Sequence, residues 1–221
     1  MLKLYHTPIS ANSRRVWIAL LEKEIEFELV EMKLDGDQFQ PEFMDISPFN
    51  HIPVLVDDDF SVVESLAILD YLEAKYPTPA MLPNNAKDIA TVRMVQMVSV
   101  NELLPAMNPL IQQMMGFGEL DSQKQEQSKQ KVATALNFLE NLIGDRSFFG
   151  ANNLTLADIV AGTAVPWCPS IGVPLDGYPK LNAWCEQLIQ RNSWEITQPT
   201  PEAIEAFKPR VKELMARLHS K

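Results

Sequence analysis

The chain has 221 residues, of which 46% are hydrophobic and 22% charged, and its formal net charge is -10. This composition is that of a globular protein that can bury a full core, and the length suits two domains. The excess of acidic residues argues against a nucleic-acid partner and against an anionic membrane as partner, because both need a basic surface.

The first third of the chain alternates between strand and helix patterns. Short strands are predicted at residues 2–6, 27–32, 53–56 and 60–63, where apolar residues alternate or turn residues bound a short apolar run. Helices are predicted at residues 13–23 and 65–75, where apolar side chains recur at helical spacing, and a single helical turn near residues 41–45. The resulting order, βαβαββα, indicates an α/β domain.

Beyond the proline-rich stretch at residues 76–79 the pattern is helical. Helices are predicted at residues 88–104, 111–115, 122–143, 156–165, 181–190 and 201–218. We expect a kink or a restart at Pro105 and Pro109 and a bend at Pro209, because proline cannot donate a helical hydrogen bond. The sequence is therefore divided into an α/β domain at residues 1–78, a linker at 79–87 and an all-helical domain at 88–221.

The start of the chain and its cysteines bear on the compartment. Residues 1–10 contain no basic region followed by an apolar region, so they do not resemble a secretory signal. No run of about 18 apolar residues marks a membrane span. The two cysteines, Cys168 and Cys185, form no C-x-x-C motif, which argues against a disulfide framework or a zinc site. We expect a cytoplasmic protein.

Two of the predicted helix starts differ in whether an acidic side chain pairs with the free N–H groups of the first turn. Thr155 is a good N-cap, and Asp158 stands three residues later, where its carboxylate can accept the Thr155 N–H in a capping box. We interpret this start as structural.

The helix start at Glu64 and Ser65 has no such acid. Ser65 is the expected N-cap, and the turn behind it consists of the apolar residues 66–68. Free N–H groups and the positive end of the helix dipole would bind a carboxylate or a phosphate, and Glu64 would bind an ammonium group. The alternative interpretation is that Ser65 and water satisfy this helix end.

Pro53 opens a predicted strand, where its missing N–H is tolerated. A cis Ile52–Pro53 bond would leave the main chain of Ile52 free to pair with an extended ligand, although trans is the more frequent isomer.

The loop before the first helix contains Ser10 and Ser13. Either hydroxyl serves as the N-cap, for which Ser13 is favoured, or donates a hydrogen bond to a thiolate. The neighbouring Arg14 and Arg15 are interpreted as members of surface or interdomain salt bridges.

Four segments, in this order along the chain, resemble the cytosolic glutathione transferases: Ser10–Val16, Asn50–Leu55, Glu64–Leu72 and the Thr155–Asp158 box. The resemblance is to the serine-type classes (theta, delta and phi), with zeta-like features at residues 15–20. It implies a thioredoxin-like N-terminal domain followed by an all-α helical-bundle domain. It also implies a cytoplasmic homodimer with a role in detoxification.

The same resemblance implies how glutathione is bound. Ile52, before a cis Pro53, would pair with the cysteinyl part, and Glu64 and Ser65 would hold the γ-glutamyl ammonium and carboxylate. The positions that would approach the glycyl carboxylate are Gln38, Gln40, Asn50 and His51, of which His51 is the main candidate.

The implied activity is conjugation of the glutathione thiolate to small hydrophobic electrophiles. Ser10 would stabilise the thiolate, with Asn12 and Ser13 as alternatives for the sulfur contact. Glutathione is the co-substrate, and no metal or other cofactor is needed. Side chains proposed for the electrophile pocket are Met107, Met114, Phe117 and Trp167.

Three other activities remain open within the family. Asn12 is compatible with glutathione-dependent disulfide or peroxide reduction, and the zeta-like features are compatible with an isomerase. A non-catalytic interaction module of the same fold is the third alternative.

Overall fold

The computed structural model describes residues 1–209, which form two compact units. The first unit comprises Met1–Pro79 together with the segment that begins at Ser193, and the second comprises Ala80–Asn192. Within residues 1–209 no helix is long and apolar enough to cross a membrane. The linker placed at residues 79–87 remains a prediction.

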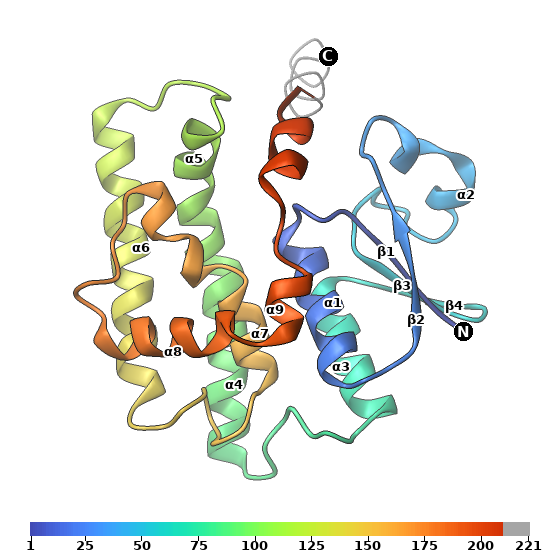
Figure 1. The fold of residues 1–221 in the computed structure, drawn as a ribbon, viewed down its shortest axis with the longest axis horizontal. Helices are drawn as coiled ribbons and strands as arrows, with labels where there is room; N and C mark the ends of the chain where they lie inside the picture. The colour runs from blue at the N-terminus through green and yellow to red at the C-terminus, as the bar shows by residue number, and fades with distance from the viewer. Residues whose placement is uncertain (210–221) are drawn as a thin grey trace. The chain divides into compact units, whose positions relative to one another are not determined.

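The first unit is built on a four-stranded sheet of order β2-β1-β3-β4 (Figure 1). Its strands are β1 (Leu2–His6), β2 (Phe27–Glu31), β3 (Val54–Asp57) and β4 (Phe60–Val63). Strands β1 and β2 are parallel and are connected by helix α1 (Ala11–Glu22), whereas β3 is antiparallel to both β1 and β4. A short 3-10 turn η1 (Asp37–Phe39) and helix α2 (Pro41–Met44) precede β3, and helix α3 (Ser65–Lys75) follows β4. The predicted order βαβαββα is confirmed.

The two faces of the sheet bury different layers. Tyr5 and Val54 pack with Phe43 of α2 on one face. Neighbouring strand residues point to the opposite face, where Leu4 and Leu55 are fully buried. Helices α1 and α3 lie side by side against that face, as Figure 1 shows.

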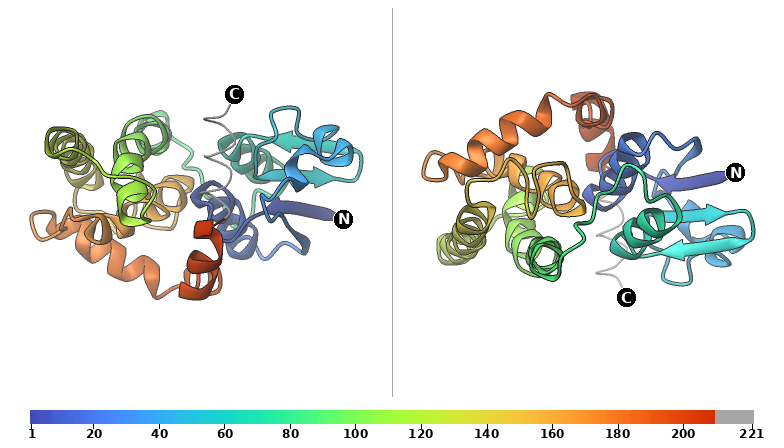
Figure 2. Two further views of the ribbon diagram at one scale, coloured as in Figure 1. Left: turned by 90° about the horizontal axis from the view of Figure 1, so that it is seen from above. Right: turned by 90° about the horizontal axis from the view of Figure 1, so that it is seen from below.

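The regular elements of the second unit are all helices or helical turns, apart from an isolated β-bridge between Phe148 and Ala151. Its elements are α4 (Ala86–Val98), the π-helical turn η2 (Ser99–Leu103), α5 (Leu104–Met114), α6 (Ser122–Ile143), α7 (Leu156–Gly162), the 3-10 turns η3 (Val165–Trp167) and η4 (Pro169–Ile171), and α8 (Pro179–Ile189). Helices α5 and α6 lie side by side (Figure 2).

The helix is irregular before Pro105 and Pro109 and not at these prolines, where an interruption was expected. Both prolines lie inside α5, and the helix does not restart at residue 111. The irregularity comes earlier, as the π-helical turn at Ser99–Leu103. Pro105 is in the first turn of α5, where its missing N–H is tolerated.

The C-terminal segment returns to the first unit. It contains α9 (Asn192–Ile196) and a helix over residues 201–209; the part of the predicted helix beyond this point falls outside the described residues, and the bend at Pro209, the last of them, remains a prediction. Arg14 of α1 donates through Nε to Thr197 Oγ1 (3.2 Å) and through Nη2 to the Trp194 carbonyl (3.1 Å). The Ser193 hydroxyl also donates to the carboxylate of Glu22. The salt bridge expected for Arg14 is wrong, because these acceptors are neutral and the side chain is buried.

The start of α7 confirms the predicted capping box. Asp158 is fully buried and accepts the Thr155 N–H (2.8 Å) and the Thr155 hydroxyl (2.7 Å). It also accepts the Phe149 N–H (2.9 Å) and the Trp184 indole Nε1–H (2.9 Å). Burial raises the pKa of Asp158 to about 6 against the opposing effect of these donors, so the carboxylate is ionised at neutral pH. One side chain therefore connects three segments of the helical unit.

A buried lysine joins the ends of α1 and α3. Lys23 Nζ donates to the carbonyls of Tyr76 (2.7 Å) and Pro79 (2.8 Å) and lies 2.7 Å from Glu73 Oε2. Its side chain has no solvent exposure. These contacts satisfy carbonyls at and beyond the C-terminal end of α3.

Replacing Lys23 by methionine is expected to lower the free energy of unfolding by about 2–3 kcal/mol, because two carbonyls lose a charged donor. Urea denaturation measures this change. Lys3→Met is the control, since the pair of Lys3 with Glu28 is 43% and 44% exposed and such pairs contribute little. An unchanged urea midpoint for Lys23→Met would contradict the structural role.

Candidate functional site

The residue that precedes helix α3 has an unusual backbone conformation. Glu64 is the N-cap, with φ 67° and ψ 115°, and makes no side-chain cap hydrogen bond. Ser65 is therefore the first residue of the helix, and its prediction as N-cap is wrong. A positive φ at a non-glycine residue costs free energy and is often found at functional sites. The first turn contains no acid, as predicted, so no side chain of that turn neutralises its N–H groups.

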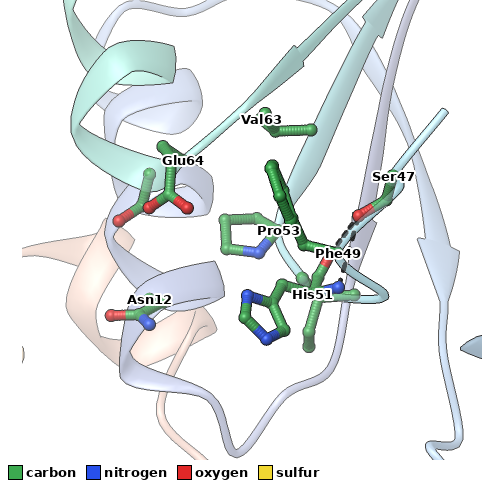
Figure 3. Close-up of a pocket in the computed structure, with 9 residues that line it drawn as sticks. Asn12, Ser47, Phe49, His51, Pro53, Val63 and Glu64 are labelled. Atoms are coloured by element: carbon green, nitrogen blue, oxygen red, sulfur yellow. Dashed lines mark hydrogen bonds between the residues drawn. The ribbon is translucent and has the colours of Figure 1, made fainter.

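A cavity of about 80 Å³ opens at this helix start. It is lined by Asn12, Ser47, Phe49, His51, Ile52, Pro53, Val63, Glu64 and Ser65. Figure 3 shows Glu64 and Asn12 on one side of Pro53 and Ser47 on the other, with the His51 ring below Pro53 in this view. Drug-sized pockets span about 300–1,000 Å³, so this cavity suits one polar head group rather than a whole ligand.

The loop before β3 shapes the opposite wall. The hydroxyl of Ser47 donates to the His51 carbonyl (2.9 Å) and accepts the His51 N–H (3.3 Å), as the dashed lines in Figure 3 mark. The Ile52–Pro53 peptide bond that follows is cis. The sequence predicted His51, Ile52 and Pro53 here but missed Ser47 and Phe49. The Ser47-Pro48 step, which is typical of a turn, was the available signal.

The first loop places its serines differently from the prediction. Ser10 is the N-cap of α1, and its Oγ accepts the Ser13 N–H at 3.2 Å. Ser13 is buried within the first turn, where its Oγ lies 3.5 Å from the Thr7 N–H. The preference for Ser13 as N-cap is therefore wrong. Because Ser10 uses its oxygen as acceptor, its O–H remains a donor. Neither serine lines the cavity, whereas Asn12 does.

The remaining candidates for the glycyl carboxylate lie outside this cavity. Gln38 is buried, and its Oε1 accepts the Gly36 N–H (3.1 Å). Gln40 is exposed before α2. Asn50 has a φ of 57°, and its N–H donates to the Ser47 carbonyl (2.9 Å). Of the four predicted positions, only His51 lines the cavity.

Arg15 reaches the same helix start from inside the first unit. Its side chain is fully buried, and Nη1 donates to Ser65 Oγ at 3.3 Å. Burial lowers the pKa of Arg15 to about 10, so the guanidinium remains charged at neutral pH. The expected salt bridge at a surface or between domains is wrong. The available signal was helical spacing, because Arg15 stands three and four residues before the buried Ile18 and Ala19.

Comparisons with known proteins agree with this geometry. The family model "Glutathione S-transferase, N-terminal domain" matches residues 4–80, and "Glutathione S-transferase, C-terminal domain" matches residues 89–192. Maleylacetoacetate isomerase of Mus musculus is 30% identical over 202 residues, which cover 89% of this chain and 91% of the relative. The chain belongs to the glutathione S-transferase family.

Solved structures of the family share the fold. A delta-class glutathione transferase of Nilaparvata lugens superposes with a TM-score of 0.81 at 25% identity, covering 96% of this chain and 99% of its own. A glutathione S-transferase-I bound with lactoylglutathione gives 0.77 at 27% identity, with coverage of 89% and 97%. The predicted family and the predicted two-part fold are confirmed, and the chain is a glutathione S-transferase enzyme.

The residues predicted for the electrophile pocket of this glutathione S-transferase differ in exposure. Met107 is only 1% exposed and belongs to the core of the helical unit, and its place in an electrophile pocket remains a prediction. Met114 is 40% exposed, and Phe117 and Trp167 are partly exposed. For these three residues as well, the pocket remains a prediction.

Both cysteines of the glutathione S-transferase are buried free thiols. Burial raises the pKa of Cys168 and of Cys185 to about 12 in each case. No group of three or more acidic, histidine or cysteine side chains within residues 1–209 is arranged to hold a metal ion.

Neither thiol is therefore expected to react with an aromatic disulfide reagent at pH 8 while the protein is folded, because almost no thiolate is present and access is blocked. The absorbance of the released thiol measures the reaction. Both cysteines should react after unfolding in guanidinium. Rapid labelling of one thiol in the native protein would show that its surroundings open in solution.

Proposed function

We propose that this enzyme conjugates the thiolate of glutathione to small hydrophobic electrophiles. The observation that carries the proposal is the cavity at the start of α3, where Glu64 and Ser65 face the loop that ends in cis Pro53. In it, the first-turn N–H groups and the Ser65 hydroxyl bind the γ-glutamyl carboxylate, and Glu64 binds the ammonium group. The size of the cavity fits this head group, while the rest of the tripeptide extends past it.

The remaining contacts follow the extended tripeptide. The main chain of Ile52 pairs with the cysteinyl residue, and His51 approaches the glycyl carboxylate. The Ser10 hydroxyl donates to the sulfur and favours the thiolate over the thiol. The thiolate then attacks the electrophilic carbon, a C–S bond forms, and the leaving group departs with the electron pair of its bond. No metal or other cofactor takes part.

The wider setting is proposed on the same basis. The enzyme acts as a cytoplasmic homodimer in detoxification, with glutathione and the electrophile as its partners and without nucleic acid or a membrane. Met114, Phe117 and Trp167 contribute to the electrophile pocket.

Two observations favour other reactions at the same site. Asn12 lies in the same first loop as Ser10 and lines the cavity, which is compatible with glutathione-dependent disulfide reduction. The similarity to a maleylacetoacetate isomerase favours a cis–trans isomerisation in which glutathione adds to a double bond and is released again.

Three parallel assays separate these reactions. The purified protein is passed over immobilised glutathione and then tested for conjugation to a chlorodinitrobenzene, reduction of a small disulfide, and isomerisation of a maleyl ketone. Retention together with conjugation as the dominant rate is the expected result. Disulfide reduction or isomerisation without conjugation would overturn the proposal, and failure to bind glutathione would overturn it as well.

A further inference from the structure

The guanidinium of Arg15 is only partly satisfied within the folded chain. Nη1 has a partner in Ser65 Oγ, whereas Nε and Nη2 are buried without any hydrogen-bond partner among residues 1–209. Burial of a charged group without full pairing costs several kcal/mol. An apolar residue of similar size would stabilise the fold at least as well at this position. Stability alone therefore does not explain a charged side chain here.

The neighbouring arginine gives the contrast. Arg14 is also buried, at 4% exposure, but its Nε and Nη2 both have acceptors, at Thr197 and Trp194. Arg14 therefore holds the C-terminal segment. Arg15 instead places its charge at the first residue of α3.

Helix α3 supplies no cation of its own at this end. Its first turn consists of the apolar residues 66–68 after Ser65, and its basic residue, Lys75, is in the last turn. A ligand carboxylate at the helix start would therefore be stabilised by the N–H groups of the first turn and by the positive charge of Arg15, which belongs to α1.

We propose that Arg15 is a positioning residue that acts through Ser65 on the anionic group of the ligand. Because Ser65 Oγ accepts from Arg15, the hydroxyl proton is free to point into the cavity that Ser65 lines. The adjacent positive charge makes that O–H a stronger donor. Arg15 thereby fixes the preference of this site for a carboxylate. The inference rests on the proposed function, in which this carboxylate is that of the γ-glutamyl residue.

Two ligands and three variants test the inference. The ligands are glutathione and 4-aminobutanoyl-cysteinyl-glycine, which is identical except that it lacks the γ-glutamyl α-carboxylate. Dissociation constants are measured by calorimetry for wild type, Arg15→Met, Arg15→Lys and the matched control Arg14→Met. Thermal melts of the unliganded proteins accompany each measurement.

The wild type is expected to bind glutathione at least about ten-fold more tightly than the analogue. In Arg15→Met, glutathione affinity should fall on the order of ten- to hundred-fold, the range given by loss of a hydrogen bond to a charged group, while analogue affinity stays the same. Arg15→Lys keeps the charge, so its affinity for glutathione should lie between that of wild type and that of Arg15→Met. Arg14→Met should keep the wild-type ratio of the two affinities.

An equal loss of affinity for both ligands in Arg15→Met would show a structural role and overturn the inference, as would an unchanged ratio. If Arg15→Met does not fold, Arg15→Lys decides: a wild-type ratio in that variant, together with a wild-type ratio in Arg14→Met, would overturn it. Failure of the wild type to bind glutathione has a different meaning, because it would overturn the proposed function first.

Discussion

Replacing Asp158 by alanine is expected to lower the free energy of unfolding by roughly 3–6 kcal/mol, enough to unfold many domains at room temperature. The carboxylate accepts four hydrogen bonds in a fully buried position, from Phe149, from Trp184 and twice from Thr155. Alanine leaves these donors buried without an acceptor, and each such group costs about 1–3 kcal/mol. Urea denaturation followed by tryptophan fluorescence measures the loss, since Trp184 is one of the donors.

Asp121→Ala is the matched control for Asp158→Ala. Asp121 is also an acid at a helix start and accepts the Lys124 N–H at 2.9 Å, but it is exposed at the N-cap of α6. Water replaces its oxygen there, so we expect a much smaller loss of stability. The loss of stability in Asp158→Asn should lie between the losses in Asp158→Ala and Asp121→Ala. The amide keeps one acceptor oxygen but places an NH2 group opposite a donor. Similar urea midpoints for Asp158→Ala and wild type would contradict the role of this box.

Replacing Ser10 by alanine is expected to lower kcat for conjugation about 10²- to 10³-fold, the effect of removing one donor from a developing or stabilised anion. The hydroxyl oxygen of Ser10 is occupied by the Ser13 N–H, which leaves the O–H to donate to the glutathione sulfur. Without it, the bound thiol should return toward its ordinary pKa of about 8.5. The rate of the variant should therefore rise with pH above neutrality, where the wild-type rate has already levelled off. Steady-state assays from pH 6 to 9 measure both effects.

The loss of an N-cap must be separated from the loss of chemistry. Ser10→Ala also removes the cap of α1, which costs about 1 kcal/mol of stability. Asn85→Ala removes a comparable cap, the bond from the Asp88 N–H at the start of α4, and should leave kcat unchanged. Ser10→Thr retains both the hydroxyl and the cap, so most of the activity should remain. If Ser10→Ala keeps full conjugation activity and Asn12→Ala loses it, Asn12 rather than Ser10 contacts the sulfur.

The fold was largely predictable because the apolar residues of its strands and helices recur at the spacing typical of each element. The Thr155–Asp158 box was predictable from local spacing alone, since both partners lie within one helical turn. The π-helical turn at Ser99–Leu103 was not predictable, because it carries neither proline nor glycine and depends on how the surrounding helices pack. Proline at positions 105 and 109 suggested a break, but Pro105 is in the first turn of α5, where proline does not prevent a helix, and α5 continues through Pro109.

The candidate site was predictable where a feature was local, and not where it depended on tertiary packing. The uncompensated first turn of α3 could be predicted from the three residues after Ser65. The contact of Arg15 with Ser65 spans 50 positions, and burial of a charged side chain runs against its usual preference for solvent. The choice between Ser10 and Ser13 as N-cap depended on a difference of three residues in where α1 begins, and sequence patterns rarely determine helix boundaries that closely.

The return of the C-terminal segment to α1 has a consequence for how the protein is made. The bond between Arg14 and Thr197 joins residues 183 positions apart. During synthesis from the N-terminus, domains generally fold as soon as their residues are complete. Here the sheet, α1 and α3 are finished by residue 79, yet the acceptors that cover Arg14 are translated more than a hundred residues later. We therefore expect the first unit to leave Arg14 without these acceptors until residues 194–197 have been synthesised.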